Sequence, residues 1–230
     1  MKDNLSLIKK EFLKSFPEIY SKPSKVNKYL KKYSNAIEKD LKNKFLNLGL
    51  DKTFVIYANG GFGRKEIFPI SDIDISIVEK DSKKNYTKLE EFISFLWDRG
   101  YKVGHSVRSI SDIKKISKTD LKEFTSYLTR RTIVSDNEMD EKINMVLSKL
   151  WTKNNFYNAK YVEQQKRHND FYSTAYNLEP DLKESPGTLR DFQSALWILQ
   201  HCFNLSSQLI GKRIIRDLKQ HTHIKKEDIK

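Results

Sequence analysis

The sequence predicts an α+β fold, in which a small mixed β-sheet backed by helices is followed by an all-helical unit. Strand-like and helix-like segments alternate through roughly the first hundred residues, as is typical of a small sheet covered by helices. From about residue 112 the signals are mostly helical, and after Trp151 only breaks with proline or glycine interrupt them. We therefore expect a first domain over residues 1–136 and a helical domain over residues 137–230.

A long helix and a short strand open the first domain. Residues 24–48 carry apolar side chains at helical spacing, with Ser24 as the expected N-cap and Gly49 as the expected stop. The apolar run TFVIYA, residues 53–58, predicts a short buried strand.

The next strand has an alternating pattern. In DIDISIV, residues 72–78, the polar residues Asp72, Asp74 and Ser76 share one face and the isoleucines share the other. Because the isoleucine face must pack into a core, we expect the aspartates to point into an open cleft.

A second helix and a third strand complete the predicted sheet region. Residues 85–99 have one apolar side and stop at Gly100, and YKVGHSVRS, residues 101–109, is typical of a strand. Farther along, TIVSD, residues 132–136, is a candidate edge strand between two helical segments.

Composition limits the class of protein. The chain has 230 residues, a net charge of +13 and one cysteine, Cys202, so it has no internal disulfide framework. No stretch resembles a secretory signal or reaches the length of a membrane span, so we expect a cytoplasmic protein with no membrane partner. The lysines are scattered and arginines are few, which favours a solvated surface over a nucleic-acid partner without excluding the latter.

Three glycines follow the first strand, in NGGFGR. Gly60, Gly61 and Gly63 allow the backbone to turn sharply and to direct several N–H groups to one point, an arrangement that binds phosphate oxygens. Taken alone, the pattern also fits an ordinary tight turn after a strand. It is neither a Walker loop nor the dinucleotide fingerprint.

The aspartate pair favours the phosphate-binding interpretation. Asp72 and Asp74 are close enough on one strand face to share metal ions, and two such carboxylates repel each other unless a cation lies between them. Magnesium supplies that cation and keeps coordination positions for substrate phosphates. Together the two motifs predict a site in which glycines hold a triphosphate and aspartates hold its Mg²⁺.

These motifs resemble the nucleotidyltransferase superfamily of DNA polymerase beta. The segment GGFGRKEIFPISDIDISIV is most similar to the PII uridylyltransferase branch, whose pattern runs GGYGRGEL…SDIDLL. The similarity continues in LWDRGYKVGHSVRS, in DLKEFTSYLTRR and in the long segment from FYNAKYVEQQKRHND to LRDFQSALWIL, and covers roughly residues 50 to 200.

The resemblance implies a polymerase beta-like nucleotidyltransferase fold and transfer of UMP from UTP to a tyrosine hydroxyl of the PII nitrogen-regulatory protein, with release of pyrophosphate. It implies that Asp72 and Asp74 are the catalytic metal ligands for Mg²⁺. It also implies that the β- and γ-phosphates bind near the glycine turn, at the positions Gly60, Gly61, Gly63, Arg64 and Ser71.

A third carboxylate or a general base is not identified by the pattern. Family members often carry a further carboxylate on the strand after the helix, but KVGHSVRS offers none. His105 is a candidate base, although strand alternation groups it with core valines and favours a core histidine. Asp120 and Glu66 are further candidates.

The segment NLEPDLKESPGTLRD in the helical domain has two interpretations. It fits a capped turn between helices, and the resemblance implies an active-site wall with Glu179, Asp181 and Arg190 facing the nucleotide. Two residues depart from the family pattern: Lys65 and Thr188 each stand where the family usually has glycine.

Two alternatives to the uridylyltransferase interpretation stay open at this point. One is a nucleotidyltransferase that modifies a small molecule or an RNA end, and the other is a catalytically inert fragment. The family continues into a hydrolytic HD domain and ACT domains, whereas HTHIKKEDIK offers only His221 and His223 in an HxH pattern. We therefore expect a helical domain truncated at its C-terminus, with no UMP-removing activity and no response to glutamine.

Overall fold

The protein is described by a computed structural model that covers residues 10–14, 22–80, 86–171 and 181–203. The chain divides into two compact units, Met1–Ser148 and Lys149–Lys230. No helix among these described residues is long and apolar enough to cross a membrane.

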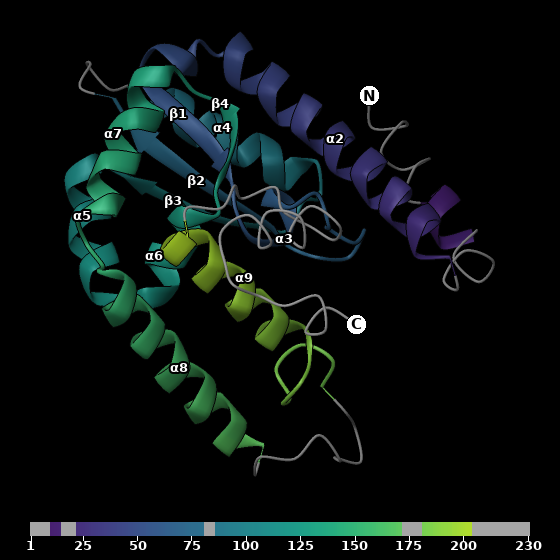
Figure 1. Ribbon diagram of the computed structural model, residues 1–230. Coiled ribbons are helices and arrows are strands. Elements are labelled where there is room, and N and C mark those ends of the chain that lie inside the picture. Colours follow the sequence, from purple (N-terminus) through teal and green to yellow (C-terminus); the bar gives the residue numbers. More distant parts are fainter. Residues whose placement is uncertain (1–9, 15–21, 81–85, 172–180, 204–230) are drawn as a thin grey trace. The chain divides into compact units, whose positions relative to one another are not determined.

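The first unit contains a four-stranded mixed sheet with helices on both faces (Figure 1). The strand order is β3-β2-β1-β4; β1 is antiparallel to β2 and β4, whereas β2 and β3 are parallel. The predicted α+β class and edge strand are confirmed. In chain order the elements are α2 (Pro23–Asn47), η1 (Leu50–Lys52), β1 (Phe54–Ala58), α3 (Gly60–Gly63), β2 (Ile73–Glu79), α4 (Tyr86–Asp98), β3 (Val103–Arg108), α5 (Ile110–Thr119), α6 (Leu121–Leu128), β4 (Arg131–Val134) and α7 (Asn137–Ser148).

Helix α2 begins at Pro23, directly after Lys22, and not after Ser24. Pro23 occupies the first turn and Lys22 is the N-cap, so the expected cap at Ser24 is wrong. Proline suits this position because the first N–H groups of a helix have no intrahelical partner. Gly49 ends the helix in the left-handed conformation at φ 67°, as predicted.

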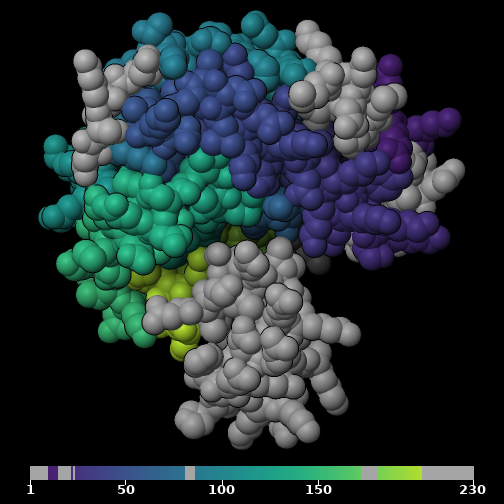
Figure 2. Space-filling model, turned by 90° about the horizontal axis from the view of Figure 1, so that it is seen from above, coloured from purple at the N-terminus to yellow at the C-terminus, as the bar shows by residue number. Residues whose placement is uncertain are grey.

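The core lies between one face of the sheet and helices α2 and α4. Ile37, Leu41 and Phe45 of α2 are fully buried against it, and the ring of Phe45 lies edge-on 5.3 Å from that of Phe92 of α4. In the space-filling view the purple and blue residues of α2 and the segments after it form one continuous surface (Figure 2).

The opposite face of the sheet is partly covered by α5, α6 and α7, which lie together in Figure 1. Tyr57 of β1 donates a hydrogen bond from its hydroxyl to Asp140 Oδ1 of α7 at 2.7 Å. Burial raises the pKa of the Tyr57 phenol, and the Asp140 carboxylate raises it further. This contact keeps α7 on the sheet, although the boundary expected near residue 136 assigns it to the helical domain.

The second unit contains α8 (Lys153–Asp170) and α9 (Leu189–Phe203) in its described part. Thr152 caps α8, accepting the Asn155 N–H at its side-chain oxygen at 3.2 Å. The turn at residues 181–188 leads into α9, and proline and glycine interrupt helical structure there as predicted.

The four-residue helix α3 ends in a Schellman motif. Glu66 N–H donates to the Gly61 carbonyl at 2.9 Å and Lys65 N–H donates to the Phe62 carbonyl at 3.1 Å. Lys65 sits at the position of the motif that is usually glycine, and its φ of 60° is left-handed. Its ammonium group donates to Asn35 Oδ1 at 2.8 Å. The family glycine at this position therefore has a conformational reason, which this chain meets with a strained lysine.

Replacing Lys65 by glycine should stabilise the turn. A non-glycine residue in the left-handed region costs about 1 kcal/mol, so Lys65→Gly should have a free energy of unfolding about 1 kcal/mol above that of Lys65→Ala. Both variants lose the ammonium contacts, and only the alanine variant keeps a Cβ. Urea denaturation of the full chain measures the difference, and equal stability of the two variants would contradict this account.

Candidate active site

The aspartates lie on the face of β2 away from the α2–α4 core, as the alternation predicts. Asp72 directly precedes the strand, Asp74 is its second residue, and both are exposed. Ile73 and Ile75 are each only 2% exposed and belong to the core. By strand geometry, side chains two residues apart lie about 7 Å apart on one face. The strand therefore presents both carboxylates on the same open side.

Antiparallel pairing brings the glycine turn beside Asp74. The last residue of β1, Ala58, pairs with Ile75, and the Asn59 N–H donates to the Asp74 carbonyl at 2.9 Å. The buried Asn59 side chain also donates to Ser76 Oγ at 2.5 Å. Asn59 thus ties the start of α3 to β2 through both its backbone and its side chain.

The Asp74 carboxylate occupies a slot between two glycines. A Cβ on Gly60 would lie 2.9 Å from Asp74 Oδ2, and a Cβ on Gly104 would lie 2.8 Å from Asp74 Oδ1. Gly104 pairs with Asp74 across β2 and β3. Sequence reasoning missed this residue, although an isolated glycine inside a strand indicates a close approach of other atoms. Any side chain at either glycine would displace the carboxylate.

The three glycines of the turn serve different purposes. Gly60 has a left-handed φ of 53°, whereas Gly61 has an ordinary φ and open space where its Cβ would be. Gly63 is required by packing, because a Cβ would lie 2.8 Å from the Ala58 carbonyl oxygen. The Gly63 N–H donates to the Asn59 carbonyl at 2.7 Å, so it is engaged within the turn. Gly60 and Gly61, at the start of α3, are the positions whose N–H groups have no intrahelical partner.

Arg64 and Ser71 flank the turn and the strand. Arg64 Nε donates to Glu66 Oε2 at 2.8 Å, so this arginine pairs with one candidate for the third carboxylate. Ser71 is exposed and directly precedes Asp72. The roles of both residues as phosphate ligands stay predictions.

Asp120 is engaged in a helix cap, and His105 lies on the other face of the sheet from Asp74. Asp120 is the N-cap of α6, and its Oδ1 accepts the Lys122 and Glu123 N–H groups at 2.8 and 3.1 Å. His105 pairs with Ile75 and so lies on the opposite face of the sheet from Asp74. It is exposed and not a core histidine, because β3 is an edge strand.

The residues present fit a magnesium ion held by two carboxylates. Across the described ranges, no group of three or more His, Cys, Asp and Glu side chains could hold a metal ion. Magnesium in phosphate-transfer sites is often held by one or two carboxylates, with water and substrate phosphate as the other ligands. Asp72 and Asp74 could supply two such carboxylates, and the glycines on either side of Asp74 leave room for its side chain.

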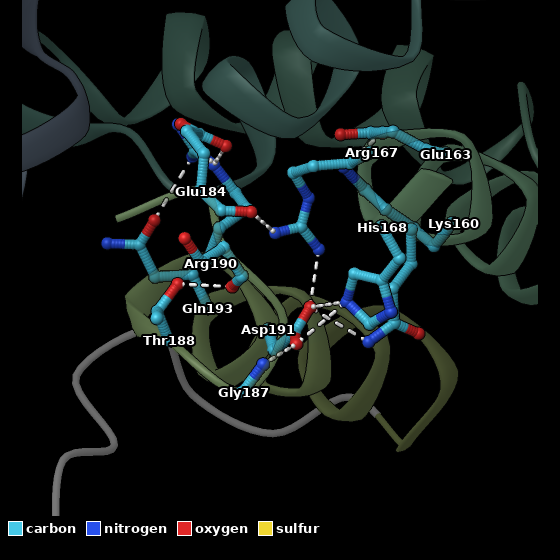
Figure 3. Close-up of polar contacts among 12 residues, drawn as sticks. Lys160, Glu163, Arg167, His168, Glu184, Gly187, Thr188, Arg190, Asp191 and Gln193 are labelled. Carbon is cyan, nitrogen blue, oxygen red and sulfur yellow. Dashed lines mark hydrogen bonds and ion pairs between the residues drawn. The ribbon is translucent and has the colours of Figure 1, made fainter. Parts of the chain in front are cut away.

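In the second unit the conspicuous polar cluster centres on Asp191 of α9 (Figure 3). The cluster joins α9, α8 and the turn before α9. The Asp191 carboxylate accepts hydrogen bonds from Arg167 Nη2 at 2.5 Å, His168 Nε2 at 2.9 Å, Gln164 Nε2 at 2.9 Å and the Gly187 N–H at 2.6 Å. Burial raises the pKa of this carboxyl, but the hydrogen bonds outweigh burial and hold the pKa well below its usual range.

The residues expected to face the nucleotide from this unit are engaged in its own turn. Asp181 Oδ1 accepts the Lys183 and Glu184 N–H groups at 2.7 and 2.9 Å. Arg190 Nη2 pairs with Glu184 Oε1 at 2.8 Å. Glu179 lies outside the described residues, as do His221 and His223. These contacts support the capped-turn interpretation of NLEPDLKESPGTLRD.

Thr188, unlike Lys65, departs from the family pattern without backbone strain. Gly187, the residue before it, takes the left-handed conformation at φ 78°. Thr188 itself has an ordinary φ, and its Oγ1 donates to the Ser185 carbonyl at 2.5 Å. One glycine therefore suffices for this turn.

Comparison with known proteins gives a consistent family assignment. Residues 155–230 match the family model described as GlnD PII-uridylyltransferase. The bifunctional uridylyltransferase/uridylyl-removing enzyme of Hydrogenovibrio crunogenus is 33% identical over 216 residues, which are 92% of this chain and 24% of that enzyme. By sequence, the chain belongs to the PII-uridylyltransferase family. The resemblance predicted from its motifs is confirmed.

Other relatives carry the same name. The enzyme of Pasteurella multocida is 38% identical over 168 residues, or 70% of this chain and 19% of that enzyme. The enzyme of Aliivibrio fischeri is 39% identical over 158 residues, or 67% and 18%. The chain thus spans about a quarter or less of the length of these uridylyltransferases. A solved chain titled "Crystal structure of the toxin-antitoxin with AMP-PNP" aligns with 57% of this chain at 18% identity and a TM-score of 0.33.

Gly104→Ala should impair the site of this family member without unfolding it. The added methyl group meets only the far end of the Asp74 side chain, so the carboxylate must move while the backbone stays unstrained. We expect Mg²⁺-dependent nucleotide binding to weaken by about tenfold, because ligand geometry controls metal affinity. Titration calorimetry measures it. The control, Ser106→Ala on the same face of β3, should bind nucleotide normally. Normal binding by Gly104→Ala would show that the close approach of Gly104 to the Asp74 carboxylate does not matter for binding.

Asp191→Asn should destabilise the helical unit and remove part of its acid sensitivity. The carboxyl has a lowered pKa in the folded state, so its stabilisation is present above the unfolded pKa of about 4 and is lost as the pH falls below it. We expect a loss of about 2 kcal/mol at pH 7, because Arg167 loses its charged acceptor.

Denaturation followed by tryptophan fluorescence at pH 7 and at pH 3 measures both effects of the Asp191 change. The exposed Asp170 at the end of α8 provides the matched control, Asp170→Asn, which should leave stability at pH 7 unchanged. An Asp191→Asn variant as stable as wild type at pH 7 would show that the Asp191 carboxylate contributes nothing to the stability of the helical unit.

Proposed function

We propose that this chain carries a Mg²⁺-dependent nucleotidyl transfer, with UTP as nucleotide donor and a tyrosine hydroxyl of the PII signalling protein as acceptor. The observation that supports it most is the Asp74 carboxylate held between Gly60 and Gly104 at the start of the glycine turn. Membership of the PII-uridylyltransferase family supports the choice of donor and acceptor.

In this proposal Asp72 and Asp74 hold magnesium, and the N–H groups of Gly60 and Gly61 bind the β- and γ-phosphates. Bound Mg²⁺ neutralises charge on the triphosphate and lowers the pKa of the attacking phenol. The phenol oxygen forms a bond to the α-phosphorus as the bond to the β-phosphate oxygen breaks, so pyrophosphate leaves and UMP stays on the tyrosine.

A base must accept the phenol proton during this transfer. Glu66 is the candidate that adjoins the turn, because its N–H donates a hydrogen bond to the Gly61 carbonyl. Its carboxylate pairs with Arg64, so a role as base requires that pair to separate. Asp120 caps α6 and His105 lies on the opposite face of the sheet from Asp74, so neither is proposed as the base.

Two other functions are separated from this one by a single assay. A nucleotidyltransferase acting on a small molecule or an RNA end would use the same aspartates, and the net charge of +13 gives an RNA acceptor some support. Incubation with labelled UTP, ATP or CTP, with and without PII protein, measures which nucleotide is transferred and to what. Transfer that needs no PII protein favours the small-molecule or RNA acceptor, and no transfer indicates an inert fragment. We also propose a cytoplasmic location.

Asp72→Asn and Asp74→Asn should each lower turnover by at least about a hundredfold, or about 2.7 kcal/mol of transition-state stabilisation. Each change removes a charge that, in this proposal, holds a metal ion. Both positions are exposed and lie outside the core, so the fold should persist. Transfer of labelled UMP and the melting temperature are measured together. The exposed Asp98 at the end of α4 provides the control, Asp98→Asn. Near-normal transfer by either site variant would refute the assignment.

A further inference from the structure

An arginine of β4 contacts the glycine turn from behind. Arg131 Nε donates to the Gly63 carbonyl at 2.8 Å, and its Nη2 donates to the Phe62 carbonyl at 3.2 Å. The third nitrogen, Nη1, pairs with Glu38 Oε2 of α2 at 2.8 Å. The Arg131 side chain is only 20% exposed. Every nitrogen of the guanidinium group is thus engaged.

The turn needs contacts of this kind from outside. The last carbonyl groups of a helix have no intrahelical donors, and a helix of four residues consists only of ends. The Schellman motif supplies donors to the Gly61 and Phe62 carbonyls, and further donors must come from other elements. Arg131 supplies two donors at the C-terminal end, opposite the N–H groups of Gly60 and Gly61.

Arginine is suited to this position by its shape. The planar guanidinium group donates in several fixed directions, which lets one side chain bind two adjacent carbonyls and a carboxylate. The group also lies over the Phe62 ring, with its central carbon 5.7 Å from the ring centroid. Lysine, with a single nitrogen, cannot reproduce these contacts.

Glu38 orients the arginine and links it to α2. The neighbouring Ile37 is fully buried in the core, so this part of α2 is anchored. Glu38 Oε2 also lies 3.6 Å from Nζ of Lys65, the left-handed residue that follows α3. The Glu38 carboxylate thus contacts both Arg131 and Lys65.

We infer that Arg131, oriented by Glu38, is a positioning residue that holds the Gly60–Gly63 turn against Asp74 before nucleotide binds. Donors fixed in advance bind phosphate without first losing conformational freedom. The structural half of the inference stands on the contacts above, and its effect on nucleotide binding rests on the proposed function. Neither residue contacts the reacting groups.

The first experiment measures amide hydrogen exchange in the full chain. The N–H groups of Lys65 and Glu66, which close the Schellman motif, should exchange about tenfold faster in Arg131→Ala than in wild type, because local opening becomes easier. The matched control is Arg130→Ala, since Arg130 is the adjacent arginine and bonds instead to the Tyr127 carbonyl at 2.8 Å and to Asn144 at 2.8 Å. Its change should leave these two amides unaffected. Unchanged exchange of these two amides in Arg131→Ala would show that Arg131 does not hold the turn.

The second experiment measures binding and transfer with UTP and Mg²⁺. Arg131→Ala should raise the KM for UTP by about tenfold with a smaller change in kcat, since lost preorganisation weakens binding. Arg131→Lys should fall between alanine and wild type, and added guanidinium ion at non-denaturing concentration should partly rescue Arg131→Ala. Should the alanine variant not fold, the lysine variant carries both measurements.

The two experiments separate the two proposals. A wild-type chain that neither binds nor transfers UTP refutes the proposed function, while the exchange rates still decide whether Arg131 holds the turn. Faster exchange with unchanged KM in an active enzyme overturns the positioning role. Equal loss of UTP binding in the Arg130 control also overturns it, because the effect would then be general destabilisation.

Discussion

The close packing of the Asp74 carboxylate between two glycine Cα atoms is the constraint on which the candidate site depends. Asp74 lies on a central strand, Gly60 lies two residues after the end of one neighbouring strand, and Gly104 lies on the other. The slot exists only if both strand registers are kept, because a slip of one residue would turn Asp74 to the other face. The buried isoleucines set that register. Core packing thus aligns the site, and Phe62 of the glycine turn is itself part of that core.

The glycine turn shows how a short element is held in an unfavourable conformation. Helix α3 is too short to be stable by itself, contains a left-handed glycine and ends at a left-handed lysine. Its stability comes from neighbours: Asn59 ties its start to β2, and Arg131 binds the carbonyls at its end. A turn that binds phosphate, as proposed for this one, needs N–H groups left unpaired at its start, so the donors that support its carbonyl end must come from neighbours.

The helical unit organises charge differently. Asp191 gathers donors from α8 and from the turn before α9, and Arg190 pairs with Glu184 beside it. Cations and carboxylates balance within this cluster, and buried charges are stable only when paired and hydrogen-bonded in this way. The charged motif is therefore accounted for by packing of the unit itself. The net charge of +13 lies outside this balance and resides largely in scattered lysines.

Local pattern determined much of this protein without reference to structure. The alternation in DIDISIV, the stop at Gly49, the edge strand and the family motifs follow from periodicity and backbone preference, which neighbouring residues encode. Alternation grouped His105 with Val103 and Val107 and favoured a core position, but its exposure depends on β3 being an edge strand. Only the tertiary structure decided that Gly104 borders Asp74 and that Arg131 binds the carbonyl of Gly63, 68 residues away. Such contacts depend on strand register and on the packing of distant elements, and no local periodicity carries that information.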